Sequence, residues 1–172
     1  LNEHSTHSSK IATVKEDIRS YQCGGEGLSK WWFGPTDTNS QRALGGIACA
    51  TTKRMNFIPL PIATTEFREA YDRGRATIFG IAVGQEHTIY IASIYGYSGS
   101  HDSTSRANAT DAIFQSLVLE MQHHPKAPTF IIGDFNADLN DIDTVKDLLG
   151  AGWTDLGGNA FIWNRKVGDY TC

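Results

Sequence analysis

A carboxylate and a carboxamide lie two residues apart in Gly133-Asp134-Phe135-Asn136, directly after the apolar run Phe130–Ile132. An apolar run that ends in a glycine predicts a buried strand. On an extended backbone this spacing directs Asp134 and Asn136 to the same side, out of the carboxyl end of a strand, where α/β proteins usually place their chemistry. The alternative is an Asx turn, the common structure for Asp and Asn beside Gly. Both interpretations stay open from these four residues.

The charge distribution favours cation binding near this motif. The chain of 172 residues has a formal net charge of −4. Residues 130–157 hold six Asp against one Lys, whereas residues 1–129 hold twelve acidic and twelve basic residues. An acidic cluster attracts cations and argues against a broad basic patch for nucleic acid. A site that grips phosphate through a metal ion needs no such patch, so a DNA substrate stays open.

The elements that must position these residues can be predicted from periodicity. Residues 8–22 and the stretch from Ser103 or Ser105 to His123 carry single apolar stripes that predict helices, and a short helix is expected at 141–149. Residues 51–74 have two prolines and mixed charges, and are expected to be loop and poor strand. Strands are expected at residues 31–33, 43–50, 76–83, 87–95 and 129–133.

Length and composition indicate one globular domain, because 40% hydrophobic and 20% charged residues are globular values. No apolar run approaches the roughly 20 residues that cross a bilayer. The cysteines Cys23, Cys49 and Cys172 have no Cys-x-x-Cys spacing, which predicts free thiols in a reducing compartment and argues against zinc. We therefore expect an intracellular protein, with a nuclear location left open.

Several segments resemble one enzyme family. Ile131–Asp138 is similar to the Gly-Asp-Phe-Asn signature of the endonuclease/exonuclease/phosphatase superfamily, which includes deoxyribonuclease I and the apurinic-site and retrotransposon endonucleases. Asn2-Glu3-His4 resembles its Gln-Glu-Thr motif, and Ser93–Tyr97 resembles its Asn-x-Tyr-Gly motif with Ser93 in place of Asn. The resemblance implies an α/β (α+β) fold, a four-layer sandwich of two packed mixed sheets flanked by helices. Residues 1–172 would form part of that domain, incomplete at both ends.

The resemblance also implies roles for individual residues. Asp134 would orient or deprotonate the attacking water, and the hydroxyl of Tyr95 would contact the phosphate. Asn136 would hold a phosphate oxygen or help to steer the nucleophile. Glu3 would bind the divalent ion, Mg²⁺ or Mn²⁺, which prefers oxygen ligands. Arg106 is a separate case, because an arginine in the first turn of a helix opposes the helix dipole and so suggests a phosphate contact. A solvated surface charge is the alternative for Arg106.

The implied function is metal-dependent phosphodiester hydrolysis by a retrotransposon-type endonuclease acting on DNA. A phosphatase or sphingomyelinase of the same superfamily, or a catalytically dead interaction domain on this fold, are the alternatives. A calcium loop is disfavoured because Leu139 and Val145 occupy the positions where an EF-hand needs Gly and Glu. The Arg-Ile-Asp-Tyr and Ser-Asp-His motifs of the family are absent from the 172 residues, so we expect this stretch alone to be inactive.

Overall fold

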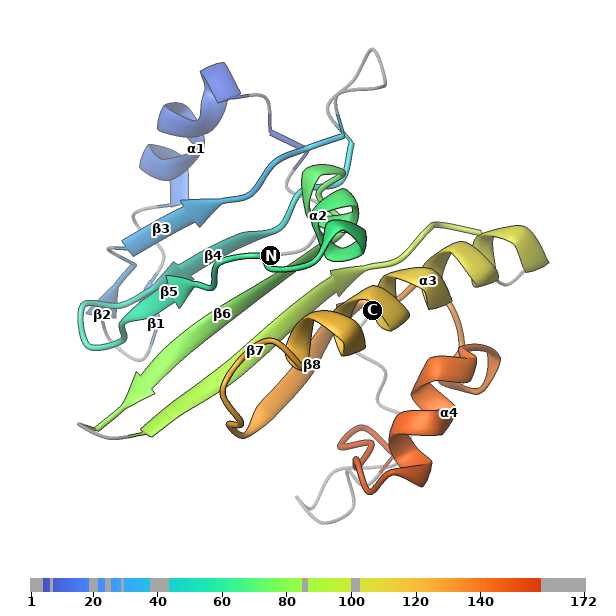
Figure 1. The fold of residues 1–172 in the computed structure, drawn as a ribbon. Helices are drawn as coiled ribbons and strands as arrows, with labels where there is room; N and C mark the ends of the chain where they lie inside the picture. The colour runs from blue at the N-terminus through green and yellow to red at the C-terminus, as the bar shows by residue number, and fades with distance from the viewer. Residues whose placement is uncertain are drawn as a thin grey trace.

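The computed structural model describes residues 5–6, 8–18, 22–23, 26–28, 30–37, 44–84, 87–99 and 103–158. The described residues form a mixed α/β structure around a four-stranded sheet with the strand order β5-β6-β7-β8 (Figure 1). Two small antiparallel sheets, β1-β2 and β3-β4, belong to the N-terminal part of the chain. The predicted α+β class is confirmed at this level.

The centre of the large sheet is the hairpin of β6 (Ala76–Val83) and β7 (His87–Tyr95), paired antiparallel along their whole lengths. The short strand β5 (Phe57–Pro59) pairs antiparallel with the outer edge of β6. On the other side β8 (Thr129–Asp134) pairs parallel with β7. The strands expected at 76–83, 87–95 and 129–133 are therefore confirmed, and the parallel pair brings the carboxyl ends of β7 and β8 to one edge.

Helices cover one face of this sheet (Figure 1). The helix α3 (Thr104–Met121) connects β7 to β8, which a parallel pair requires, and α2 (Thr65–Asp72) connects β5 to β6. Alternate residues of the strands meet apolar side chains of both helices in the main core. Its buried members include Phe67, Ala70, Ala76, Ile78, Tyr90, Ala92, Ile94, Ile113, Phe114 and Leu117.

Residues 51–74 were expected to be loop and poor strand; the short strand β5 agrees with this, but the helix α2 corrects it. Thr64 is its N-cap, and the Thr64 hydroxyl accepts a hydrogen bond from the backbone N–H of Phe67 at 3.4 Å. Glu120 of α3 is fully buried and accepts hydrogen bonds from the N–H of Ala63 at 2.7 Å and from the N–H and hydroxyl of Thr64. A distant carboxylate thus fixes the start of α2, and a local sequence pattern does not reveal such a partner.

The N-terminal part contains α1 (Ile11–Ile18), preceded by a 3₁₀ turn at Ser8–Lys10. The predicted helix over 8–22 is too long, because Gln22 lies in β1 (Gln22–Cys23), which pairs with β2 (Glu26–Gly27). A Gly-Gly dipeptide separates these two strands, a composition that favours a hairpin over helix continuation.

The strand β3 (Lys30–Phe33) was expected and pairs antiparallel with β4 (Ala48–Thr51). The strand expected at 43–50 is therefore displaced, because Gly45 and Gly46 have positive φ and interrupt it. The ring of Trp32 in β3 packs edge-on against Phe79 of β6, with 4.9 Å between ring centroids. This contact fixes the small β3-β4 sheet against the large sheet.

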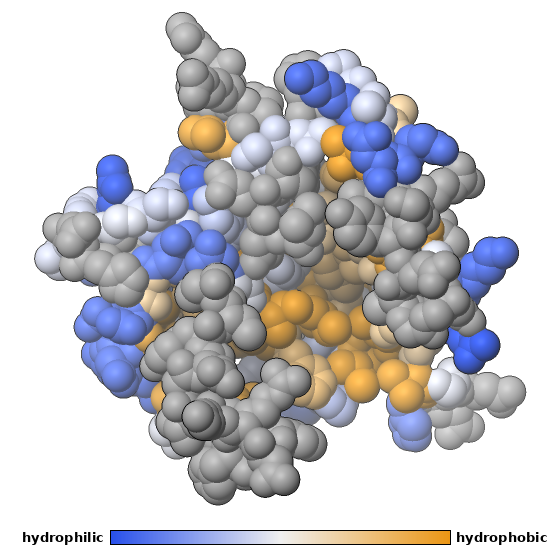
Figure 2. All heavy atoms as spheres, turned by 180° about the vertical axis from the view of Figure 1, so that it is seen from behind, coloured by the Kyte–Doolittle hydropathy of each residue, from blue (hydrophilic) through white to orange (hydrophobic). Residues whose placement is uncertain are grey.

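A 3₁₀ turn at Leu139–Asp141 and the helix α4 (Asp143–Gly150) follow β8, where a helix over 141–149 was expected. Ile142 and Val145 are buried against the main core. Seen from behind, the molecule shows a patch of apolar side chains (Figure 2). The described residues contain three sheets, of two, two and four strands. Within the described residues, none of the helices combines the length and apolar character needed to cross a membrane.

Candidate functional site

A basic, a phenolic and an acidic side chain lie in one row across three neighbouring strands. Tyr95 of β7 is the register partner of Asp134 of β8, and the N–H of Tyr95 donates to the carbonyl of Arg75, at the start of β6, at 2.8 Å. Their neighbours Ala76 and Ile94 belong to the helix-covered core. Because successive strand residues alternate between faces, Arg75, Tyr95 and Asp134 share the opposite face of the sheet.

Arg75 lies between two tyrosine rings. Its guanidinium carbon is 4.7 Å from the ring centroid of Tyr95 and 4.4 Å from that of Tyr97. The side chain is only 9% exposed, and Nη1 donates to the carbonyl of Gly96 at 3.0 Å. Among the described residues, the Nε of Arg75 is buried without a hydrogen-bond partner, which is costly for a charged donor.

A second arginine adds positive charge beside the same rings. A hydrogen bond with Tyr97 raises the pKa of Arg73 above its ordinary value, so Arg73 stays cationic at neutral pH. Two arginines therefore contact the Tyr95–Tyr97 segment. Guanidinium groups are suited to planar oxyanions such as phosphates, because their donors form a rigid fork.

Asn136 is reached through a turn and not through an extended strand. The strand β8 ends at Asp134, and Asn136 has a φ of 51°, a left-handed conformation that Asn tolerates better than most residues. Oδ1 of Asp134 accepts a hydrogen bond from the N–H of Asn136 at 3.2 Å, which is an Asx turn. The expectation that both side chains project from one extended backbone is therefore wrong, and the turn interpretation holds.

The turn nevertheless brings Asn136 to the end of β7. Its Nδ2 donates to the carbonyl of Gly96 at 3.3 Å, and the N–H of Gly96 donates to the carbonyl of Asp134 at 2.8 Å. A Cβ at Gly96 would lie 1.9 Å from the carbonyl oxygen of Phe135, so only glycine allows this close approach. The Gly96 carbonyl accepts from both Arg75 and Asn136 and thereby links the row to the turn.

The other two predicted site residues are not part of this arrangement as described. Arg106 is exposed on the first turn of α3, and its Nη1 donates to the carbonyl of Ser98 at 2.7 Å. This contact gives Arg106 a structural role in holding the preceding loop. Glu3, the predicted metal ligand, lies outside the described residues. The geometry thus brings together Asp134, Asn136 and Tyr95.

The donor set for a metal ion is incomplete in the described part of the chain. Within it, no three His, Cys, Asp or Glu side chains are close enough to form a metal site. Asp134 is exposed and is the carboxylate of the row itself. A divalent ion at this position would therefore need at least one further carboxylate, such as Glu3.

Arg75 is the site residue that sequence reasoning passed over. The sequence signal was an arginine at the start of a strand whose antiparallel partner ends in Tyr95. Register and burial, which the sequence does not give directly, distinguish Arg75 from the other arginines.

Comparisons with protein-family models and with curated proteins find no match to this chain.

Proposed function

We propose that this chain forms part of a metal-dependent phosphodiester hydrolase, specifically a DNA endonuclease of the retrotransposon type. The observation that supports this most is the row of Arg75, Tyr95 and Asp134 beside Asn136, at the carboxyl ends of β7 and β8. It combines a proton acceptor, an amide donor and a buried cation in one place. These are the groups that a phosphate ester needs around it during hydrolysis.

We assign to Asp134 the activation of the attacking water. Its side chain is exposed, so water and substrate can reach the carboxylate. In hydrolysis the water oxygen forms a bond to phosphorus, the bond from phosphorus to the leaving oxygen breaks, and Asp134 accepts the proton of the water. The leaving oxygen needs a proton in turn, and the family resemblance assigns it to a histidine of a Ser-Asp-His motif absent from these 172 residues.

We assign to Arg75 and Asn136 the binding of the substrate phosphate. The hydrogen bond from Asn136 to Gly96 is long at 3.3 Å, so its amide can exchange that partner for a phosphate oxygen. The buried guanidinium of Arg75 adds positive charge on the same side of the sheet. Donors held in a buried site cost no reorganisation when charge develops on the phosphoryl oxygens.

Mg²⁺ or Mn²⁺ would be held by Glu3 together with acidic groups near Asp134. A bound divalent ion supplies Lewis-acid polarisation of the phosphoryl oxygen. We also propose that the complete domain has two packed sheets in four layers. The protein would act inside the cell, in the nucleus, where DNA is the substrate. The acidic charge near Asp134 suits a substrate bound through a cation more than one bound by a basic surface.

The test is nicking of supercoiled plasmid by the full natural protein with Mg²⁺. Asp134→Asn removes the proton acceptor but keeps the size of the side chain, so we expect activity to fall by about 10²–10⁴-fold. Asp143→Asn is the matched control, because Asp143 is an exposed acid of α4 paired with Lys146 at 2.7 Å. Equal activity of the Asp134→Asn variant and the wild type would reject the proposal.

A further inference from the structure

A second cation lies at the α2 end of the row, and the proposed chemistry does not use it. Arg73 closes α2, since its N–H donates to the carbonyl of Glu69 at 3.2 Å, and its side chain is exposed. Gly74 follows with a φ of 65°, and a Cβ there would lie 2.5 Å from the backbone nitrogen of Gly46. Only glycine fits this turn, so the backbone between Arg73 and Arg75 is held in one conformation.

Tyr97 connects Arg73 to the row. The hydroxyl of Tyr97 accepts a hydrogen bond from the Arg73 side chain, and its ring centroid lies 4.4 Å from the guanidinium carbon of Arg75. The same carbon lies 4.7 Å from the ring centroid of Tyr95, so the two centroids are at most about 9 Å apart, the sum of these distances. Arg73 therefore lies about one aromatic ring beyond the residues assigned to hydrolysis.

The helix α3 fixes Tyr97 from the other side. The N–H of Tyr97 donates to the hydroxyl of the buried Thr110 at 3.0 Å. Arg106 holds the next residue, because its Nη1 donates to the carbonyl of Ser98 at 2.7 Å. A side chain whose backbone is held in this way needs little reorganisation when it binds a ligand.

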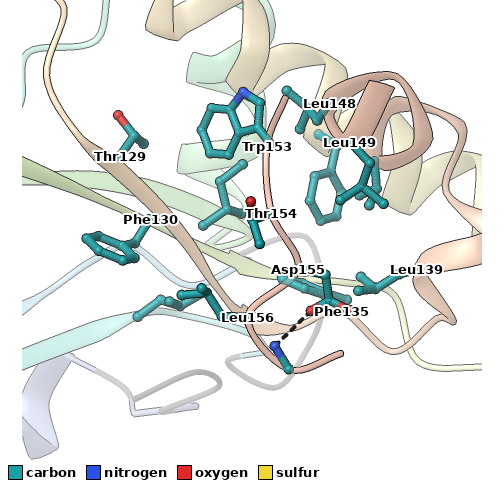
Figure 3. A pocket seen from close by; sticks show the side chains of 15 residues that line it. Thr129, Phe130, Phe135, Leu139, Leu148, Leu149, Trp153, Thr154, Asp155 and Leu156 are labelled. Atoms are coloured by element: carbon teal, nitrogen blue, oxygen red, sulfur yellow. Dashed lines mark hydrogen bonds between the residues drawn. The ribbon is translucent and has the colours of Figure 1, made fainter. Parts of the chain in front are cut away.

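The opposite end of the row presents an apolar surface. Beyond β8 lies a cavity of about 240 Å³ between β8, α4 and residues 153–157 (Figure 3). Phe130, Ile132 and Leu149 contribute to its wall, and Asp155 is the one charged residue among the described residues that line it. A wall of this composition does not attract phosphates, so the favourable path for a longer polyanion leads toward Arg73.

Two acids act on the same cation. Glu69 and Asp37 interact electrostatically with Arg73. Glu69 is exposed, so water and salt screen its attraction. A phosphate can accept two parallel hydrogen bonds from a guanidinium, and such a contact is stronger than a screened pair.

We propose that Arg73 and Tyr97 bind the phosphate next to the scissile one on the same strand, and so select a polynucleotide over a substrate with a single phosphate. Phosphates of one strand follow each other every 3.4 Å or so along the helix axis, about 3.4 Å per nucleotide, which is within reach of a cation one ring beyond the row. The forked donors of a guanidinium suit this contact. The inference rests on the proposed function, because it takes the row as the place of hydrolysis.

The first test is binding of a short labelled DNA duplex by the full natural protein, with Asp134→Asn in every sample to prevent cleavage. Fluorescence anisotropy gives the association constant at several KCl concentrations and one Mg²⁺ concentration. We expect Arg73→Gln to lower the slope of log K against log salt by about 0.9, the value of one phosphate contact. Arg73→Lys keeps the charge and should restore the slope.

Arg68→Gln is the matched control, because Arg68 is an exposed arginine of α2 that also lies on a tyrosine ring, 5.7 Å from Tyr71. Its slope should equal that of the parent protein. An unchanged slope in Arg73→Gln, or equal decreases in both variants, would overturn the proposal. Failure of the parent protein to bind the duplex would overturn it as well.

The second test measures the preference for a polynucleotide in the protein that keeps Asp134. The readout is the ratio of kcat/KM for duplex DNA to kcat/KM for a dinucleoside monophosphate, which has one phosphate. We expect Arg73→Gln to lower this ratio about tenfold, the effect of one charge-assisted hydrogen bond. An unchanged ratio would overturn the proposal.

The two tests separate this inference from the proposed function. Plasmid nicking by the wild type together with equal salt slopes would reject the phosphate contact at Arg73 and keep the hydrolase. A lower slope in Arg73→Gln without any nicking by the wild type would reject the hydrolase and keep Arg73 as a phosphate contact.

Discussion

Gly133 and Ile94 approach each other so closely that a Cβ on Gly133 would lie 1.9 Å from the carbonyl oxygen of Ile94. Gly133 also has a φ of 152°, which L side chains rarely adopt. We expect Gly133→Ala to lower the free energy of unfolding by about 3 kcal/mol, from steric overlap and backbone strain together. Urea unfolding followed by circular dichroism measures this change.

Gly152→Ala is the control for the backbone contribution alone. Gly152 has a φ of 97° with nothing within 4 Å of its added Cβ, so its cost should stay near 1 kcal/mol. Equal losses in the two variants would show that the contact between β7 and β8 is looser than described.

Arg75 should not tolerate lysine. An ammonium group cannot reproduce the face contacts of a guanidinium with the rings of Tyr95 and Tyr97 together with its hydrogen bond to the Gly96 carbonyl. We expect Arg75→Lys to cost about 1–2 kcal/mol of unfolding free energy, measured in urea. Arg68→Lys is the matched control, since exposed Arg68 lies 5.7 Å from the Tyr71 ring. Its cost should stay below about 0.5 kcal/mol, and an equal cost at both positions would contradict the buried stack.

Glu120 should make stability depend on acid pH. Burial alone raises the pKa of Glu120, but hydrogen bonds from Thr64, from the N–H groups of Ala63 and Thr64 and from His124 outweigh it and hold the pKa below 4.5. A carboxyl with a lowered folded pKa stabilises the fold above its unfolded pKa, and this contribution is lost as the pH falls through the folded pKa. We therefore expect stability to fall below about pH 4.5.

Glu120→Gln should remove most of this slope and cost about 2 kcal/mol at neutral pH, where the N–H groups at the start of α2 lose their charged acceptor. The measurement is urea unfolding at about pH 7 and about pH 4. Glu69→Gln, an exposed change on α2, serves as control. A wild-type slope that persists in the Glu120→Gln variant would assign the acid response to another carboxylate.

Tyr95→Phe tests the hydroxyl that the family resemblance assigns to the phosphate. We expect plasmid nicking by the full natural protein to fall by about 10²-fold, because a preorganised donor acts on the transition state. Tyr90→Phe removes a hydroxyl from another buried tyrosine of β7 and should leave activity unchanged. If both variants keep wild-type activity, Tyr95 serves packing alone.

Periodicity was enough to predict the long strands and helices. Residues 76–83 and 87–95, which are rich in apolar and β-branched side chains, and the apolar run before Gly133 each formed a strand as expected. The position of α3 was also predictable. Its buried face is broader than an apolar stripe, because Thr110 and Glu120 are buried as well as Ile113 and Leu117.

The errors came from partners that lie far away in the sequence. The helix α2 begins at the N-cap Thr64, and Thr64 donates its hydrogen bonds to the carboxylate of Glu120, 56 residues away. Asn136 depends on the carbonyl of Gly96, 40 residues away, and not on the extended spacing from Asp134. Arg75 is distinguished by a stack on Tyr95 and Tyr97 that only the strand register creates. Local sequence patterns carry no information on such contacts.

The parallel pairing of β7 with β8 also sets an order of events during folding. The hairpin β6–β7 closes locally around Gly84, whereas β8 joins β7 only after residues 96–128 have been brought back across the sheet. Closing the longer loop costs more chain entropy, and this cost is offset only when α3 packs against the sheet. Arg75 and Tyr95 therefore meet early, and Asp134 arrives with the last strand. A partly folded chain would already present the cation stacked on Tyr95 before Asp134 has joined the sheet.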